Sequence, residues 1–263
     1  MDDTRLYARM HANLRQFCRL TGNASPGARV MELAGVSASV VPVAPDRSLM
    51  NSVVYDSPAD LERALAELAA TYAEAGIRAW TVWVHTGDER AAALLSEAGH
   101  RMDADPAVMC MELDGFDLPA PDDLDLEEEP SVRTFMELND RAYGFETPDF
   151  VTGIREMPGV VFNIVRVEGR PVACAGGHDH EGDCCISFVA TLPEARGRGL
   201  ARKLMILTLR EAIDRGCTTA SLQSTKMGYP VYAKLGFRDL GPLQMWERRE
   251  PGDVKSVPRH DRL

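Results

Sequence analysis

The sequence lacks a long apolar run, an excess of basic residues and paired cysteine motifs, and each absence excludes a class of protein. Without about 20 consecutive apolar residues, no segment is expected to span a membrane, and the polar start MDDTRLYARMHANLRQF lacks the apolar core of a signal peptide. Lysine and arginine total 29 against 40 aspartates and glutamates, whereas nucleic-acid-binding proteins usually carry the opposite balance. We therefore expect a cytoplasmic protein that binds neither membranes nor nucleic acid.

The six cysteines are scattered through the chain without CxxC spacing, and the adjacent pair Cys184 and Cys185 could close only a strained ring. They are expected to be reduced thiols at core and strand positions. Hydrophobic residues make up 45% and charged residues 26% of the 263 residues, close to the averages for folded soluble proteins. The length fits two small domains or one large domain.

One compositional break divides the sequence. Residues 118–130, LPAPDDLDLEEEP, have prolines at both ends of an acidic run with few large apolar side chains. This composition predicts an interdomain connection; a calcium loop is excluded because the sixth-position glycine and the closing glutamate are missing. We therefore predict an N-terminal domain at 1–118, an acidic linker at 119–130, a second domain at 131–249 and a polar C-terminal tail at 250–263.

Helical and strand patterns alternate after this linker. A helix is predicted from the spacing of apolar residues in SVRTFMELNDRAY, and another over 200–215, which Gly216 ends. Strands are predicted at VVFNIVRVEG and RPVACAGGH, joined by a turn at Glu168 and Gly169, and at CCISFVATLP and TTASLQS. A last strand near 243–246 follows the short helix PVYAKL. The alternation favours an α/β layered domain.

The first half repeats part of this order. Residues 61–113 read helix, strand, helix, strand, as residues 205–247 do, and Leu95 falls at the place of Tyr232. The two halves therefore look like tandem copies. Two unrelated arrangements are the alternative, because alternating helices and strands occur in many folds.

The segment EARGRGLARK, residues 194–203, lies between a predicted strand and the long helix. Two glycines at i and i+2 let backbone amides approach a phosphate, and the helix start adds N–H groups with partial positive charge. The segment is neither a P-loop nor a Rossmann fingerprint, because Arg202 and Lys203 occupy positions where those motifs need other residues. The pattern predicts a turn that binds a pyrophosphate.

Two motifs in this half resemble the GNAT family of N-acetyltransferases. The run Arg196-Gly-Arg-Gly-Leu-Ala201 fits that family's (Q/R)xxGx(G/A) signature, and residues 222–237 look like its strand followed by a short helix of the form YxxxGF. The resemblance covers residues 124–249 well, and it extends more weakly to the first half as a degenerate copy. It implies an α/β fold with two GNAT-like domains in tandem, each a mixed, mostly antiparallel sheet flanked by helices.

The resemblance also implies a set of residues that bind acetyl-coenzyme A as co-substrate. By analogy, the end of the strand before the turn would contact the pantetheine arm, and the Val189 amide would polarise the thioester carbonyl; such donors often make the largest contribution to catalysis. The turn would hold the pyrophosphate through its amides, with charge added by Arg196 or Arg198. The implied cofactor-binding residues are Val189, Ala190, Thr191, Arg196, Gly197, Arg198, Gly199, Leu200, Ala201 and Ser224.

Tyr232 takes the family's position for the general acid. A phenol can protonate the departing thiolate, a role typically worth about 100-fold to 10,000-fold in rate. Leu95 cannot donate a proton, and the first half has no glycine in SLMNSVVYDSPADLERA, where a phosphate-binding turn would fall. We therefore predict that the first half does not bind coenzyme A and instead packs on the catalytic half or helps to wall the acceptor site.

The residues do not single out a general base for the incoming amine. The candidates are His178, Glu146 and, through a water molecule, Ser187. The run His178-Asp-His-Glu-Gly-Asp183 predicts a polar hairpin turn, because a metal site would need a third well-spaced ligand. No metal is expected.

These features together predict an N-acetyltransferase that moves an acetyl group from acetyl-coenzyme A to a primary amine by direct attack in a ternary complex. The acceptor would be a small molecule or a peptide, and a second copy of the chain is a candidate partner in a homodimer. A non-catalytic regulatory module that binds acyl-coenzyme A is the alternative. A purely structural pairing module is a third hypothesis.

Overall fold

The computed structural model describes residues 1–250 except 146–150, 152, 155–156 and 158. The chain divides into two compact units that interleave along the sequence. Unit 1 is made of Met1–Asn13, Ala107–Glu146 and Pro158–Leu240, and unit 2 of Leu14–Pro106, Thr147–Met157 and Gly241–Leu263. This grouping differs from the consecutive domains that the sequence predicts. Apart from Glu250, the predicted tail lies outside the described residues.

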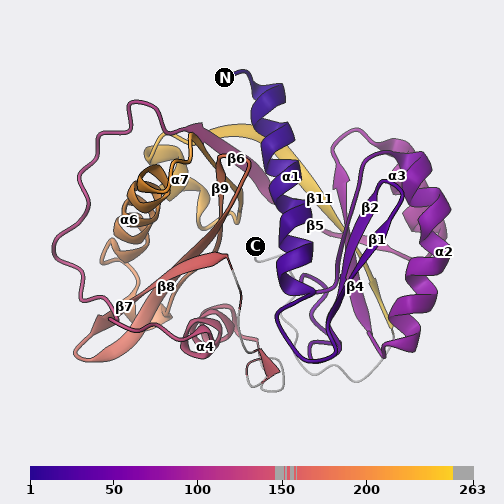
Figure 1. Cartoon of the computed structure of the whole chain (residues 1–263), viewed down its shortest axis with the longest axis horizontal. Coiled ribbons are helices and arrows are strands. Elements are labelled where there is room, and N and C mark those ends of the chain that lie inside the picture. Colours follow the sequence, from indigo (N-terminus) through magenta and orange to yellow (C-terminus); the bar gives the residue numbers. More distant parts are fainter. Residues whose placement is uncertain (146–150, 152, 155–156, 158, 251–263) are drawn as a thin grey trace. The chain divides into compact units, whose positions relative to one another are not determined.

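Unit 1 contains a sheet of mixed direction, drawn in Figure 1 with most of its strands labelled. Its strands, in spatial order, are β6 (Ala107–Glu112), β10 (Thr219–Ser224), β9 (Asp183–Thr191), β8 (Arg170–His180) and β7 (Val160–Val167). β10 runs parallel to β9, and the other neighbouring pairs are antiparallel. Two-residue turns with positive φ join β7 to β8 and β8 to β9, at Glu168-Gly169 and Glu181-Gly182. Both predicted hairpin turns are confirmed.

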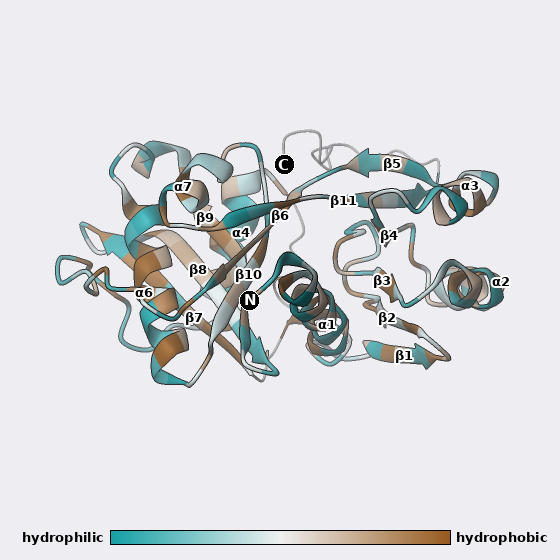
Figure 2. Cartoon of the chain, turned by 90° about the horizontal axis from the view of Figure 1, so that it is seen from above, coloured by the Kyte–Doolittle hydropathy of each residue, from teal (hydrophilic) through white to brown (hydrophobic). Residues whose placement is uncertain are grey.

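Helices cover both faces of this sheet. α4 (Val132–Tyr143) and α6 (Leu200–Asp214) are the long ones, and α7 (Tyr229–Lys234) follows β10. A Cβ atom added at Gly176 would meet Phe135 of α4, whereas one added at Gly177 would meet Thr208 of α6. Because successive side chains of a strand point to opposite faces, α4 and α6 lie on opposite sides of β8. Figure 2 shows hydrophobic and hydrophilic patches alternating along α6, as a helix with one buried face requires.

The acidic segment predicted as a linker packs on unit 1. The side chains of Leu124 and Leu126 contact a core cluster of this unit. The Glu127 amide donates to the Ile164 carbonyl at 2.9 Å, and the Arg166 amide donates to the Asp125 carbonyl at 2.7 Å. The residues on both sides of the segment belong to unit 1. These hydrogen bonds place the segment along the edge of the sheet beside β7. Its two leucines alternate with acidic residues, as side chains do in a strand.

Unit 2 contains a second sheet with helices on both faces. Its strands, in spatial order, are β1 (Arg29–Leu33), β2 (Val36–Val40), β3 (Ser52–Tyr55), β4 (Ala79–His85) and β11 (Arg238–Arg249), and β5 (Arg101–Ala104) also pairs with β11. Only the β3–β4 pair is parallel among these. The two later helices, α2 (Pro58–Glu74) and α3 (Glu89–Glu97), lie on one face, and residues 14–21 of α1 (Asp3–Thr21) lie on the other in Figures 1 and 2.

Each sheet takes one strand from the other half of the sequence. β6 precedes the acidic segment but pairs with β10, with Met111 opposite Ala220. β11 follows all of the second half's other elements but pairs with β4, with Trp246 opposite Val82. These exchanged strands are the reason that the compact units do not follow the predicted boundaries. Strand partners of this kind are long-range pairings that composition does not reveal.

Most elements that the sequence predicts are present in the structure, including α2, α3, α4, α6 and α7. α1, β1, β2, β3 and β5 were not predicted. All six cysteines are buried free thiols, as expected. In the part of the chain that the structure describes, no helix has both the length and the apolar character needed to cross a membrane.

Candidate active site

The turn before α6 is formed by two glycines in the left-handed region. Gly197 has φ 77° and Gly199 has φ 75°, and a Cβ atom on either would meet no protein atom within 4 Å. The backbone conformation, not a lack of space, therefore favours glycine here. Gly199 is the N-cap of α6 and provides no side-chain cap, and the first turn holds no acidic residue. The first N–H groups of α6 are thus suited to an anion.

A cavity of about 360 Å³ adjoins this turn. Its wall includes residues from the end of α4, the end of β9, the start of α6 and the segment that leads into α7. Small-molecule sites are typically about 300–1,000 Å³. The predicted site residues that line it are Val189, Ala190, Thr191, Arg196, Gly197, Gly199, Leu200, Ala201 and Tyr232.

The structure places the other two predicted residues elsewhere. Arg198 lines a separate hollow with Arg141 and Arg170. Ser224 is buried, and its hydroxyl donates to the Thr225 carbonyl at 2.9 Å. Neither lines the cavity, so their predicted contacts with the cofactor lack support from its geometry.

The Arg196 side chain is held by backbone carbonyls. Its guanidinium donates to the Thr191 carbonyl at 3.1 Å and to the Ala142 carbonyl at 3.2 Å. Arg196 thereby joins the end of β9 to the last turn of α4, where a cation also interacts favourably with the helix dipole. Arg202, which was not predicted, lines the cavity from the first turn of α6.

β9 is irregular where it borders the cavity. Ala190 pairs with Cys174 and Ser187 pairs with Gly176, so Phe188 and Val189 together face a single residue of β8. Phe188 has φ 54°, an uncommon value for a residue with a side chain. The Val189 carbonyl accepts a hydrogen bond from the Tyr143 hydroxyl at 2.9 Å. This is a β-bulge, a device that often redirects the backbone beside active sites.

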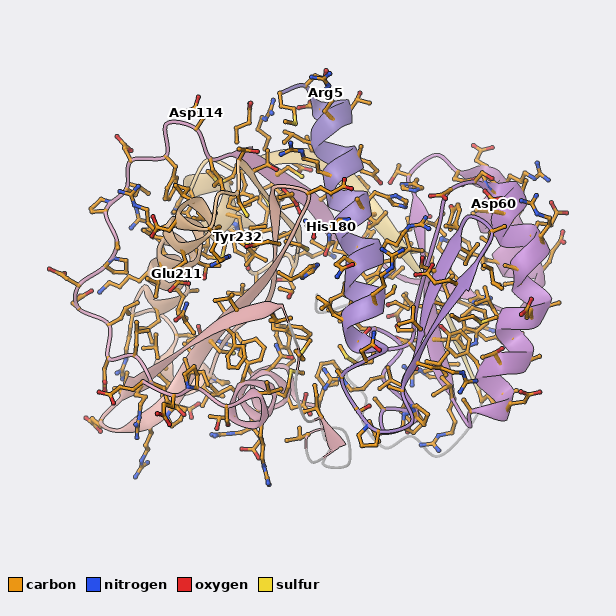
Figure 3. The ribbon with its side chains drawn as sticks, viewed as in Figure 1. Arg5, Asp60, Asp114, His180, Glu211 and Tyr232 are labelled. Atoms are coloured by element: carbon orange, nitrogen blue, oxygen red, sulfur yellow. The ribbon has the colours of Figure 1, made fainter. Side chains whose placement is uncertain are left out.

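Tyr232 is buried in α7 and lines the cavity; Figure 3 labels its side chain. Its ring lies against Gly228, where an added Cβ atom would come within 2.7 Å of Cε2. Burial raises the pKa of Tyr232 above its usual value, and the neighbouring Tyr143 raises it further. The phenol is therefore protonated at neutral pH and chemically able to donate a proton.

Eight described residues of the cavity wall are not among those predicted from the sequence. They are Ala142, Tyr143, Ala195, Arg202, Thr225, Met227, Gly228 and Val231. Four of them lie inside the segment 222–237 that carries the YxxxGF motif, so the motif itself marked their neighbourhood. Tyr143 had no such signal, because it lies at the end of a helix far away in the sequence.

Of the candidate general bases, His178 and Ser187 do not line this cavity. His178 is buried with Nε2 3.1 Å from the Asn13 carbonyl oxygen, and burial lowers its pKa. Ser187 is also absent from the wall, and Glu146 lies outside the described residues. Among the described residues of the wall there is no carboxylate and no imidazole.

The polar hairpin around Gly182 is tied to other side chains of unit 1. Asp179 forms an ion pair with Arg215. Asp183 accepts hydrogen bonds from Thr219 and Ser221, each at 2.6 Å. The described residues contain no group of three or more histidines, cysteines, aspartates or glutamates that could hold a metal ion.

The start of α2, which follows a strand of unit 2, has different chemistry. Ser57 caps α2 by accepting from the Asp60 amide at 3.3 Å, and proline follows Ser57 directly. Leu95, at the place of Tyr232, is fully buried in an apolar core cluster. The helix ends are nevertheless alike: the His100 amide donates to the Leu95 carbonyl as the Phe237 amide donates to the Tyr232 carbonyl.

Comparisons with known proteins agree with this geometry. Residues 124–237 match the family model described as acetyltransferase (GNAT) family, whereas no curated protein matches the chain. A GCN5-related N-acetyltransferase from Kribbella flavida is 18% identical with a TM-score of 0.65, over 93% of this chain and 97% of that one. A GCN5-related N-acetyltransferase from Sphaerobacter thermophilus is 18% identical with a TM-score of 0.56, over 92% and 94% of the two chains.

A third solved structure, a tandem GNAT protein from the clavulanic acid biosynthesis pathway, is 15% identical with a TM-score of 0.57, over 92% of this chain and 89% of that one. At these identities the likeness concerns the fold alone, and it extends over both units. The family match and the shared fold together support a GNAT relationship for residues 124–237.

Proposed function

We propose that this protein is an acyltransferase that moves an acetyl group from acetyl-coenzyme A to a primary amine. The observation that carries the proposal is one cavity lined by both the uncapped start of α6 and the protonated phenol of Tyr232. The first suits a pyrophosphate and the second suits a leaving thiolate. The GNAT match over residues 124–237 supports the same class of reaction.

The residues of the wall fit an acyl-coenzyme A molecule. Amides from Gly197 to Ala201 would hold the pyrophosphate, and Arg202 would add positive charge beside it. The amide of Val189 would orient the thioester carbonyl and stabilise the charge that develops on its oxygen. Acetyl-coenzyme A supplies the acetyl group as an activated thioester.

Tyr232 would act when the amine nitrogen attacks the thioester carbonyl. A carbon–nitrogen bond forms, the carbon–sulfur bond breaks, and the Tyr232 hydroxyl gives its proton to the leaving sulfur. The proton lost by the amine passes to water, and water then reprotonates Tyr232. No metal takes part in this scheme.

We also propose that the first half is a degenerate GNAT copy that does not bind coenzyme A. The tandem GNAT protein of similar fold is a precedent for such an arrangement. At the start of α2, Ser57 and Asp60 occupy the place where an anion would bind.

Calorimetric titration with acetyl-coenzyme A tests the proposal. One site per chain is expected in the unaltered protein, and Gly199→Glu is expected to abolish binding because it puts a negative side chain into the turn. Gly99→Glu is the matched control, since Gly99 also has positive φ with open space around it but lies in unit 2. Two sites per chain would contradict the degenerate copy, and no binding would contradict the proposed function.

A regulatory module that binds acyl-coenzyme A without turnover is the second candidate. It would share the cavity and the α6 start, but it would not need the proton of Tyr232. The described wall residues include no carboxylate or imidazole that could act as a general base, and this observation favours the regulatory module. Release of coenzyme A thiol in the presence of a set of primary amines separates the two, because only the enzyme produces it.

A further inference from the structure

Side chains hold two successive carbonyl groups of the β9 bulge. The Tyr143 hydroxyl donates to the Val189 carbonyl at 2.9 Å. The Cys174 thiol lies 3.5 Å from the Phe188 carbonyl oxygen, as a weak donor. The mechanism proposed above uses neither the hydroxyl nor the thiol.

Holding these carbonyls also fixes two N–H groups. A peptide group is planar, so the direction of one residue's carbonyl sets the direction of the next residue's N–H. The Phe188 carbonyl therefore sets the N–H of Val189, and the Val189 carbonyl sets the N–H of Ala190. The Val189 N–H is the amide that the proposed function directs at the thioester, whereas the Ala190 N–H lies beside the Cys174 thiol.

Both ends of α4 contact the β9 bulge. Near its start, the Phe135 ring meets the Phe188 ring edge to face at a centroid distance of 5.7 Å. Its last residue is Tyr143, whose hydroxyl is bonded to Val189. The left-handed backbone at Phe188 is unfavourable for a residue with a side chain and persists only where surrounding contacts enforce it. α4 supplies contacts of this kind.

We infer that Tyr143 is a positioning residue, which holds the Val189 carbonyl and thereby keeps Val189 in the place where its own N–H points at the thioester carbonyl of a bound acyl-coenzyme A. The inference rests on the proposed function. Burial raises the pKa of Tyr143 to about 12, and its proton is already engaged with the backbone. Tyr143 thus acts through the strand, while Tyr232 acts on the leaving sulfur.

Tyr143→Phe tests this role, with affinities for coenzyme A and acetyl-coenzyme A measured separately by calorimetry. Coenzyme A has no thioester carbonyl, so its Kd is expected to change less than about twofold. The Kd of acetyl-coenzyme A is expected to rise about fivefold and kcat to fall about tenfold, as for one lost hydrogen bond. Tyr229→Phe is the matched control, because its hydroxyl bonds Asp239 and it does not line the cavity.

The outcomes separate this inference from the function beneath it. Unaltered protein that binds neither ligand would overturn both. Unaltered protein that binds both ligands, with a Tyr143→Phe variant that behaves identically or loses both ligands equally, would overturn the positioning role alone. Cys174→Ala releases the neighbouring carbonyl and should give the same selective loss; unchanged selectivity in this second variant would also count against the role.

Discussion

The starts of α2 and α6 differ although each helix follows a strand of its sheet. α2 begins at a serine cap, with proline and an aspartate in its first turn, and its labelled Asp60 side chain is drawn in Figure 3. α6 begins at a left-handed glycine without a side-chain cap, and no acid lies in its first turn. A side chain of the protein caps the backbone N–H groups at the start of α2, whereas no side chain caps those at the start of α6.

This difference teaches that a strand followed by a helix does not by itself determine whether side chains cap the helix start. Both units have strand–helix connections of the same kind, and both have glycines with positive φ at their helix ends. What separates them is a small number of side chains at the helix start and one tyrosine in place of a leucine. Function in such a pair of units depends on which local groups remain unsatisfied.

The largest expected effect concerns the residue that distinguishes the two short helices. Tyr232→Phe should lower kcat at least about 100-fold and leave the Kd of acetyl-coenzyme A nearly unchanged, because only the proton donor is removed. Steady-state kinetics with the best amine and calorimetry measure the two quantities. Tyr72→Phe, which removes a buried hydroxyl bonded to the Ser39 carbonyl in unit 2, is the control and should retain full turnover. An unchanged rate for Tyr232→Phe would exclude it as the acid.

The next effect concerns His100, which stands after its helix as Phe237 does in unit 1. Burial, followed by the charge of Arg248, lowers the pKa of His100 from 6.5 to about 4. At pH values between these two pKa values, His100 is protonated in the unfolded state and neutral in the folded state. The free energy of unfolding should therefore fall as the pH falls. The loss approaches about 3 kcal/mol, because each tenfold change in proton affinity corresponds to about 1.4 kcal/mol.

Denaturant unfolding at several pH values measures this loss. In His100→Phe the decline between pH 6.5 and pH 4 should be shallower, because phenylalanine binds no proton. His178 has a pKa lowered in the same direction, so a part of the decline should remain. Identical pH dependence in the variant and the unaltered protein would show that His100 does not titrate in this way.

A smaller effect is expected at Gly228. Its backbone has φ −76° and ψ −31°, which alanine adopts readily, but the new Cβ atom would press on the Tyr232 ring. Gly228→Ala should therefore lower kcat about tenfold by moving the phenol. The same substitution in a Tyr232→Ala background should have no further effect on rate, and additive losses would show that Gly228 acts independently of the tyrosine.

The smallest effect is expected at the capped helix. Ser57→Ala should reduce the free energy of unfolding by about 1 kcal/mol, a typical value for a lost N-cap. The affinity for acetyl-coenzyme A should stay the same. Chemical denaturation and calorimetry measure these quantities, and a weaker ligand affinity would mean that the start of α2 takes part in binding.

Local features of the fold could be predicted from the sequence. Helix periodicity and terminal glycines indicated α6 and α7, and the positive-φ turns at Glu168-Gly169 and Glu181-Gly182 follow from glycine and hairpin spacing. The partners of β6 and β11 could not be predicted, because strand pairing over long distances depends on the whole fold. The packing of the acidic segment on unit 1 could not be predicted either. Its acidic composition is typical of a linker and gives no sign of the contacts that Leu124 and Leu126 make with the core.

The candidate site also combines residues that local sequence patterns predict with residues that they do not. The turn at Gly197 and Gly199 and the phenol of Tyr232 carry recognisable local patterns, and the structure brings them to one cavity. Arg198 carried the same motif signal but its side chain lines another hollow. No local sequence pattern marks Tyr143, because its proposed role depends on a hydrogen bond to a strand that follows much later in the chain.

The pairing of β11 with β4 sets the order in which the nascent chain can fold. β4 leaves the ribosome early, but the neighbour on its far side is made of residues 241–249, the last of the described strands. Until those residues emerge, β4 presents an unpaired edge that invites wrong partners. The strand that covers this edge of β4 is therefore made after every other described strand, and a ribosome stalled shortly before it would leave the edge unpaired.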